Sequence, residues 1–274
     1  VGGVPEHFNL PWHQCRESGQ FTDAGVEVVY RDYPGGTGAL NEALASGEID
    51  VAVLLTQGAT AAILAGNEAR IVKTYVESPL RWGIHVAANS DLSDVESIRD
   101  QRYAISRRGS GSHLMSIVDA AERNWPSQNL DFIEVGNIDG AVAALTGGQA
   151  DVFLWEQFTT QPYVDRKIFR RLGVRETLWP AFVISVNQSF LNRHADAVRR
   201  MLDVINVACE TMMEDAEAVP LIAERYGLSV DGVAEWFSLT RWSTDYRRPE
   251  AAIAKVIEYL NRLHIVDAPD ATID

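Results

Sequence analysis

The segments ALASGEIDVA (residues 43–52) and ALTGGQADVF (residues 144–153) decide the fold, because they repeat one local pattern 101 residues apart. Both contain an Ala-Leu pair, and three further positions coincide: Gly47 with Gly148, Asp50 with Asp151, and Val51 with Val152. Each copy predicts an amphipathic helix that ends at a glycine able to adopt positive φ, followed by a polar turn and an apolar strand. Two such units predict two α/β lobes of similar topology.

The rest of the chain extends this alternation. Periodicity predicts strands at 26–33, 70–76, 82–88, 102–106, 131–135 and 181–186. It predicts helices from Thr37 to Gly47, over 57–66 and after residue 107, and a largely helical region over 194–215, 217–226, 230–239 and 249–263. We therefore expect an α/β protein with mixed sheets covered by helices and a ligand cleft between the lobes.

The lobe boundaries follow from two short segments, ESPLRWG (77–83) and ETLWPAF (176–182). Each contains a proline and a tryptophan, which favours a short, stiff crossing between lobes. The first lobe would comprise residues 1–83 and 179–274, and the second residues 84–178.

Composition excludes several classes of protein. The formal charge of −14 and the scattered acidic residues argue against nucleic acid as a partner, since phosphate binding needs clustered Lys and Arg. No apolar run approaches the roughly 20 residues of a membrane span. Cys15 and Cys209 are too few and too far apart for a zinc site or a disulfide framework. We expect no metal and no cofactor.

Three stretches resemble type II periplasmic binding proteins, in the branch that includes the sulfonate, taurine and thiamine-pyrimidine binding proteins of ABC importers. They are ESGQFTDAGVEVVYRDYPGGTGALNEALASGEIDVAVL (17–54), RYAISRRGSGSHL (102–114) and GAVAALTGGQADVFLWE (140–156). The segments VPEHFNLPWH, FLWEQFTTQP and WPAFVISV are similar to a sub-branch shared by bacteria and fungi, some of whose members lack a leader.

The resemblance implies two hinged lobes that close on a small molecule. We expect no catalysis, because the sequence contains no nucleophile–base pattern and no metal-spaced cluster. The resemblance also implies a small polar organic ligand that is sulfonate-like, amino-acid-like or pyrimidine-like, with an ABC permease as a further partner, and we expect a monomer. A periplasmic location would follow if a leader preceded Val1, and a cytoplasmic one if the chain belongs to the leaderless sub-branch. An enzyme on the same fold, such as a dehydratase of a cyclic carboxylate, and a cytosolic small-molecule sensor remain alternatives.

The loop after the first short strand, VGGV, is one predicted part of the ligand site, because ligands of open α/β sheets bind at the carboxyl ends of strands. This places His7, Phe8, Asn9 and Leu10 at the cleft floor. His7 and His13 have no metal-ligand spacing. Trp12 and His13 fit a buried helix turn as core residues.

The sharper predicted site is SRRGSGSHL (106–114), where glycines let the backbone approach a ligand and a helix N-terminus offers free N–H groups. Its candidate residues are Ser106, Gly109, Ser110, Gly111 and Ser112. The alternative is plain helix capping. RGSGS is not the G-x-S-x-G motif of hydrolases.

Further candidates come from both copies of the repeat. YPGGTG and LTQGAT supply Gly36, Thr37, Thr56 and Gln57 in the first lobe. In FLWEQF the strand ends at Trp155 and Glu156, and alternation along a strand predicts that only one of them enters the cleft. Glu156 is favoured, because a carboxylate accepts hydrogen bonds from an amine or amidine. The alternative is a surface carboxylate.

Overall fold

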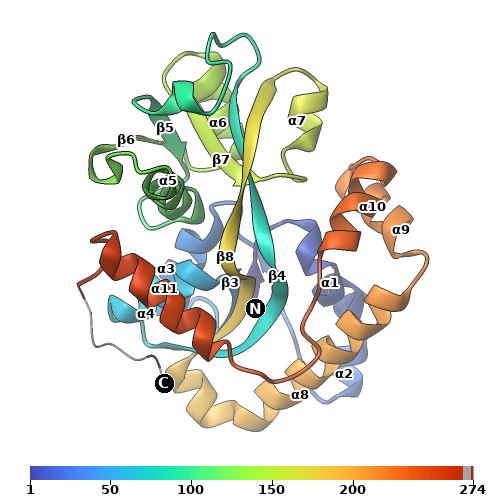
Figure 1. Ribbon diagram of the computed structural model, residues 1–274. Coiled ribbons are helices and arrows are strands. Elements are labelled where there is room, and N and C mark those ends of the chain that lie inside the picture. Colours follow the sequence, from blue (N-terminus) through green and yellow to red (C-terminus); the bar gives the residue numbers. More distant parts are fainter. Residues whose placement is uncertain (268–272, 274) are drawn as a thin grey trace.

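Two long strands, β4 (Ala69–Ala87) and β8 (Phe169–Asn187), run antiparallel and side by side through the length of the molecule (Figure 1). The computed structural model describes residues 1–267 and 273. One half of the molecule in Figure 1 contains β5, β6, β7 and helices α5 to α7. The other half contains the first elements of the chain, up to α4, and the last ones, from α8 to α11. β4 and β8 belong to both halves.

All eight strands join in one mixed sheet of order β2-β1-β3-β8-β4-β7-β5-β6. Strands β1, β2 and β3 are mutually parallel, as are β5, β6 and β7, whereas both groups pair antiparallel to β4 or β8. The remaining strands are β1 (Gly2–Gly3), β2 (Arg31–Asp32), β3 (Val51–Leu55), β5 (Arg102–Ile105), β6 (Asp131–Glu134) and β7 (Val152–Glu156).

Helices cover this sheet. Those of the first part of the chain are α1 (Leu10–Glu17), α2 (Gln20–Asp23), α3 (Gly36–Ser46) and α4 (Thr56–Leu64). The middle of the chain supplies α5 (Gly111–Glu122), α6 (Ile138–Thr146) and α7 (Gln161–Asp165). The last third forms α8 (Gln188–Glu214), α9 (Ala218–Tyr226), α10 (Val230–Leu239) and α11 (Glu250–Arg262). Short 3-10 turns η1 (His7–Asn9), η2 (Glu96–Ile98) and η3 (Ser127–Asn129) complete the elements.

The repeated sequence pattern forms the same local structure twice. In the first copy α3 ends before Gly47, whose φ is 74°. In the second copy α6 ends at Thr146, and Gly147 leads to Gly148, whose φ is 69°. The residue after each glycine donates its backbone N–H to the equivalent alanine carbonyl, Glu48 to Ala43 at 2.9 Å and Gln149 to Ala144 at 2.8 Å. Each turn leads into a strand whose five residues are all buried.

The segments between the two halves differ from the expected short crossings. ESPLRWG and ETLWPAF lie within β4 and β8, where Pro79 pairs with Pro180. The register shifts on both sides of this pair, because proline has no N–H for the ladder. The division into 1–83, 84–178 and 179–274 stays a proposal, since both long strands cross these boundaries without a break.

The expected strand over residues 26–33 is much shorter in the structure. Only Arg31 and Asp32 pair with β1, and the preceding alternation belongs to an extended segment in which Val29 is 60% exposed. The reason is that β1 itself contains two residues, so it offers few partners for a ladder.

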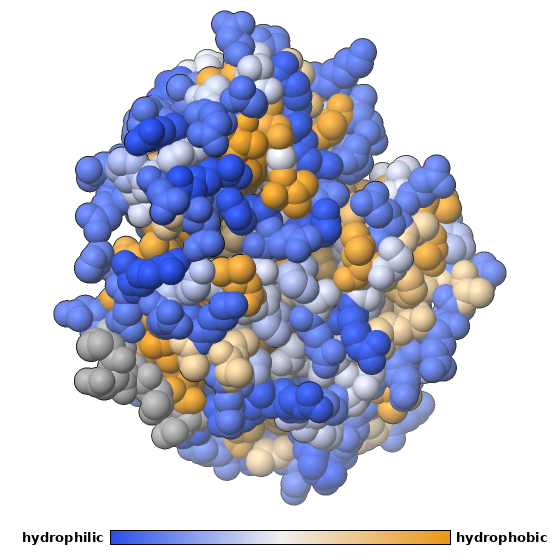
Figure 2. All heavy atoms as spheres, in the orientation of Figure 1, coloured by the Kyte–Doolittle hydropathy of each residue, from blue (hydrophilic) through white to orange (hydrophobic). Residues whose placement is uncertain are grey.

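Polar side chains predominate on the face shown in Figure 2, with separate apolar areas, one of them beside α9 and α10. Val230 and Leu239 are among the exposed apolar residues of α10. No helix among residues 1–267 has the length and hydrophobicity needed to cross a membrane.

Candidate ligand-binding site

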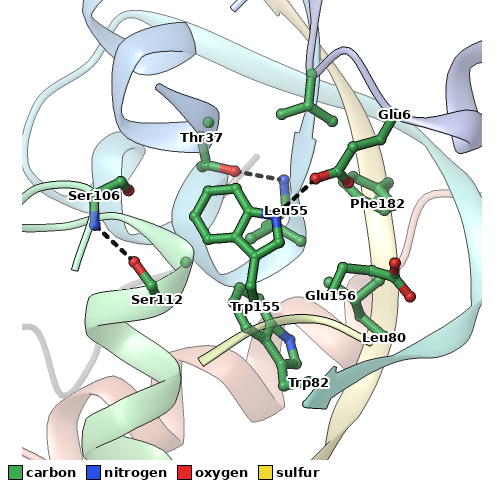
Figure 3. Close-up of a pocket in the computed structure, with 13 residues that line it drawn as sticks. Glu6, Thr37, Leu55, Leu80, Trp82, Ser106, Ser112, Trp155, Glu156 and Phe182 are labelled. Carbon is green, nitrogen blue, oxygen red and sulfur yellow. Dashed lines mark hydrogen bonds between the residues drawn. The ribbon is translucent and has the colours of Figure 1, made fainter. Parts of the chain in front are cut away.

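A cavity lies where the two halves of the molecule meet, at the carboxyl ends of β3 and β7 (Figure 3). The N-termini of α3 and α5 and the middle of β4 and β8 form the rest of its wall. Its lining residues are Val4, Glu6, Gly36, Thr37, Leu55, Leu80, Trp82, Ser106, Gly111, Ser112, Trp155, Glu156 and Phe182.

The cavity is narrow in this structure. The empty space between its lining atoms amounts to about 370 Å³, including the part that is open to solvent. Only about 30 Å³ of it can hold the centre of a water-sized sphere. Water itself needs about 10–15 Å³ by that measure, so the walls must move apart before an organic molecule can enter.

The N-terminus of α5 forms one wall. Ser110 caps the helix by accepting from the His113 N–H at 3.3 Å, whereas the Ser112 hydroxyl oxygen accepts from the Ser106 N–H at 3.0 Å. Gly111 allows the helix to approach the other half, because a Cβ at this position would lie 2.3 Å from the Leu55 Cδ1 atom. The Ser106 hydroxyl is buried, and no hydrogen-bond partner for it exists among the described residues.

The start of α3 forms the opposite wall. Gly36 has a φ of 71°, a value that favours glycine. The Thr37 hydroxyl oxygen accepts from the Leu55 N–H at 3.2 Å and so ties this helix to the end of β3. Thr37 packs tightly on α4, since a Cβ at Gly58 would lie 2.3 Å from the Thr37 methyl carbon.

The indole of Trp155 stands in the middle of the cavity and links its two sides (Figure 3). Its Nε1 donates to the Glu6 Oε1 atom at 3.0 Å, joining β7 to the loop after β1. Its far edge lies near α3, because a Cβ at Gly36 would be 3.8 Å from the Trp155 Cη2 atom. The tryptophan therefore occupies much of the space that a ligand would need.

Two glutamates line this cavity. Glu156 Oε2 accepts from the backbone N–H groups of Phe158 at 2.9 Å and Thr159 at 2.6 Å. Burial raises the pKa of Glu156 to about 7, although these two amides and Arg171 favour the ionised form. Burial, and then the negative charge of Glu156, raise the pKa of Glu6 to about 8, while the Trp155 hydrogen bond acts in the other direction.

Further contacts hold the halves together outside the cavity. Arg107, at the start of the α5 loop, forms an ion pair with Glu42 of α3 at 3.0 Å. Its side chain lies against Gly35 and Gly38, where a Cβ would come within 2.4 Å and 2.6 Å of Arg107 atoms. On the far side, Glu122 of α5 accepts from Tyr259 and Arg262 of α11, both at 2.9 Å. The molecule is thus closed around the cavity.

The model of the Ca3427-like periplasmic binding protein family matches residues 82–174, a segment that begins within β4 and ends in the first third of β8. A similar solved structure is the Candida albicans CA3427 gene product, described as defining a new family with the generic periplasmic binding protein fold. It is 26% identical, with 97% of this chain and 90% of that chain covered and a TM-score of 0.90. This chain has the type II periplasmic binding protein fold.

Two sulfonate-binding proteins share the type II periplasmic binding protein fold at lower identity. The alkanesulfonate-binding protein SsuA of Xanthomonas axonopodis pv. citri, solved with MOPS, is 17% identical over 97% of this chain and 93% of that chain, with a TM-score of 0.79. SsuA of Escherichia coli is 16% identical over 97% and 92%, with a TM-score of 0.70. None of the curated protein sequences compared with the chain matches it.

Within this fold the structure brings six of the predicted site residues to the cavity wall. They are Gly36, Thr37, Ser106, Gly111, Ser112 and Glu156. Gly109 and Ser110 belong to the same loop but do not line the cavity, because Gly109 takes a φ of 76° in the turn and Ser110 caps α5. Ser110 therefore caps α5, whereas Ser112 lines the cavity.

The loop after β1 contributes a different residue from those expected. His7 and Phe8 pack against Trp236 of α10, with ring centroids 4.1 Å and 5.1 Å away, and burial lowers the pKa of His7 to about 3. The Asn9 side chain donates to the Val4 carbonyl at 2.8 Å, and Leu10 is fully buried. These four side chains thus lie in the core, and Glu6 is the one that turns inward.

Thr56 and Gln57 also lie away from the cavity, in the first turn of α4. The Thr56 hydroxyl donates to the Pro180 carbonyl at 2.6 Å, and the Gln57 side-chain oxygen accepts from the Trp179 indole at 2.8 Å. Both residues instead fasten α4 to β8. Trp12 and His13 lie buried in α1, in agreement with the core interpretation.

Sequence reasoning missed half of the cavity wall. Trp155 and Glu156 both line it, although strand alternation favours only one, because the cavity surrounds the end of β7 rather than one face. Glu6 could have been suspected from its place in the loop after β1. Leu80, Trp82 and Phe182 could not, since they lie in segments that the sequence presents as connections.

No group of three or more His, Cys, Asp or Glu side chains suited to a metal ion occurs among residues 1–267.

Proposed function

We propose that the chain is a solute-binding protein that holds one small polar organic molecule in the cavity between its halves. The observation that carries this proposal is that two polar groups of the cavity wall lack hydrogen-bond partners in the part of the chain that the structure describes. The Ser106 hydroxyl and the Trp82 indole nitrogen are buried there without hydrogen-bond partners among the described residues. Buried polar atoms are nearly always paired, so their unpaired state supports a ligand that supplies the partners.

The hinge supports capture by closure. β4 and β8 connect the halves, and their ladder is irregular around Pro79 and Pro180. A few residues that absorb backbone rotation are sufficient for domain closure around a ligand. The ligand would enter an open form, and the contacts of Arg107 and Trp155 would form as the walls approach each other.

Native mass spectrometry of the purified protein tests this function. A bound molecule that appears as a discrete added mass, and is released on denaturation, would support it and identify the ligand. If the protein carries no molecule and binds none from a broad metabolite library in thermal-shift assays, the proposal fails.

We further propose that the protein delivers its ligand to an ABC permease. The support for this role is the fold that the chain shares with the sulfonate-binding proteins. This role entails a location outside the cytoplasm. A cytosolic sensor would use the same cavity without a permease. Co-purification with a permease, from cells that express both, separates the two roles.

An enzyme is the second candidate, favoured by one observation. Glu6 and Glu156 have pKa values raised to about 8 and about 7, which suit general acid–base catalysis near neutral pH. A dehydratase of a cyclic carboxylate would use such groups. Multiple turnover of any compound in a panel of cyclic carboxylates would establish the enzyme and displace the binding protein.

A further inference from the structure

We propose that the ligand is an organic cation whose charged nitrogen lies between Glu6 and Glu156, against the rings of Trp155 and Trp82. This inference rests on the proposed binding function and specifies its ligand class. It starts from the two carboxylates of the cavity wall, whose residues are only 7% and 3% exposed.

Neither carboxylate forms an ion pair within residues 1–267. Glu6 accepts from the neutral Trp155 indole, and Glu156 accepts from two backbone amides. Arg171 is the cation that acts on Glu156, but its guanidinium donates to the Gln157 carbonyl at 2.7 Å and to His85 at 3.3 Å. A buried carboxylate without a counter-ion is costly, and a cationic ligand would supply that counter-ion.

The aromatic walls favour the same ligand. Trp155, Trp82 and Phe182 line the cavity beside the carboxylates, as Figure 3 shows. Tryptophan faces attract ammonium and guanidinium groups, and aromatic rings with carboxylates make an environment suited to organic cations.

Two other groups of the cavity wall require a hydrogen-bond acceptor. Trp82 Nε1 can only donate, and the Ser106 hydroxyl can donate, yet both atoms are buried without a partner in the described part of the chain. The two residues are 3% and 4% exposed. A hydroxyl or carbonyl on the ligand would satisfy them.

An anion fits this cavity poorly, because no lysine or arginine is among its lining residues. Arg107 turns outward to Glu42, and Arg108 is largely exposed with Glu134 3.8 Å away. A sulfonate would therefore be repelled by two carboxylates, and only the N–H groups of α5 would donate hydrogen bonds to it. The ligand class of this chain then differs from that of the alkanesulfonate-binding structures that share its fold.

Pairs of probes that share a carbon skeleton and differ in the sign of their charge test the proposal. Isothermal titration at pH 8.5 would compare 3-aminopropan-1-ol with 3-hydroxypropane-1-sulfonate, and benzamidine with benzenesulfonate. We expect at least one cation to bind at least tenfold more tightly than its anionic partner. Tighter binding of the sulfonates would overturn the cation proposal and leave the binding function intact. Binding of neither class would also overturn it, and native mass spectrometry would then decide separately whether the binding function survives.

The Glu6→Gln variant tests the site, since it keeps the size of the side chain and removes its charge. We expect a tenfold to hundredfold loss of affinity for the cation that binds the wild type. Glu68→Gln, at an exposed position, is the matched control and should bind like the wild type. Circular dichroism and a melting curve verify that Glu6→Gln folds. A folded variant with unchanged affinity would place the cation elsewhere.

The pH profile gives an independent measurement. Because the pKa values of Glu6 and Glu156 lie at about 8 and about 7, both groups are mostly protonated at pH 6 and mostly ionised at pH 9. Besides burial, Glu156 and the Trp155 indole act on Glu6. The amides of Phe158 and Thr159, the Thr159 side chain and Arg171 act on Glu156. Affinity for a permanently charged probe, choline, should rise over this range in the wild type and rise less in Glu6→Gln. A flat wild-type profile would contradict the proposal.

Discussion

The two copies of the repeat share a backbone but end in different chemistry. Helix, left-handed glycine and buried strand coincide in α3–β3 and α6–β7. At equivalent positions β3 ends in Leu54 and Leu55, whereas β7 ends in Trp155 and Glu156. Leu55 and Glu156 both line the cavity, one as an apolar wall and one as a carboxylate. The repeat thus preserves the scaffold, while the residues at the strand ends set the chemistry of each side.

Substitution at these equivalent strand ends should give the largest effect. Glu156→Gln removes the charge, and a charge-assisted hydrogen bond contributes about 1.5–3 kcal/mol, so affinity for a cationic ligand should fall roughly tenfold to hundredfold. Leu55→Ala, the matched change in the first copy, should lower affinity far less. Titration calorimetry of both variants measures the difference. Equal losses would mean that the two strand ends play the same part.

The left-handed glycines that follow the two helices should respond alike. Gly47→Ala and Gly148→Ala each force a non-glycine residue into the left-handed region, which costs about 1 kcal/mol. No atom lies within 4 Å of a Cβ built at either position, so steric contact adds nothing. Urea denaturation should show two similar decreases in the free energy of unfolding. A loss in only one variant would show that the copies are less equivalent than their hydrogen bonds indicate.

Ser112→Ala tests the second copy's side of the cavity at a smaller scale. Backbone N–H groups of α5 remain in place, so affinity should fall less than in Glu156→Gln. The variant also leaves the buried Ser106 N–H without its partner, which should lower stability by about 1 kcal/mol. Calorimetry and thermal melting distinguish the two effects. A hundredfold loss of affinity would give Ser112 a direct role in holding the ligand.

The smallest expected effect concerns the contact between the halves. Arg107→Ala removes an ion pair whose Glu42 side chain is 73% exposed, and exposed pairs contribute about 0.2–1 kcal/mol. It also empties the space against Gly35 and Gly38. Without ligand, the radius of gyration from solution scattering should rise slightly, and saturating ligand should restore it. Identical scattering from variant and wild type in both conditions would argue against a moving cleft.

Much of the fold followed from the sequence because it depends on local interactions. Helix periodicity and glycine conformation involve residues within a few positions of each other. The left-handed conformation of Gly47 and Gly148 could therefore be predicted from the sequence. The helix start at Gly111 and the strand end at Glu156 were predicted for the same reason. Their places at the cavity wall follow from the rule that ligand sites lie at the carboxyl ends of strands.

Tertiary structure decided which neighbouring side chain faces the cavity. The Phe8 carbonyl accepts from the Trp242 indole at 3.0 Å, a contact across more than 200 residues of sequence. That packing carries His7 into the core and turns Glu6 toward Trp155. Likewise, Pro180 and Trp179 hold Thr56 and Gln57 away from the cavity. Side-chain direction in such loops depends on distant partners, because the loop backbone alone permits more than one orientation.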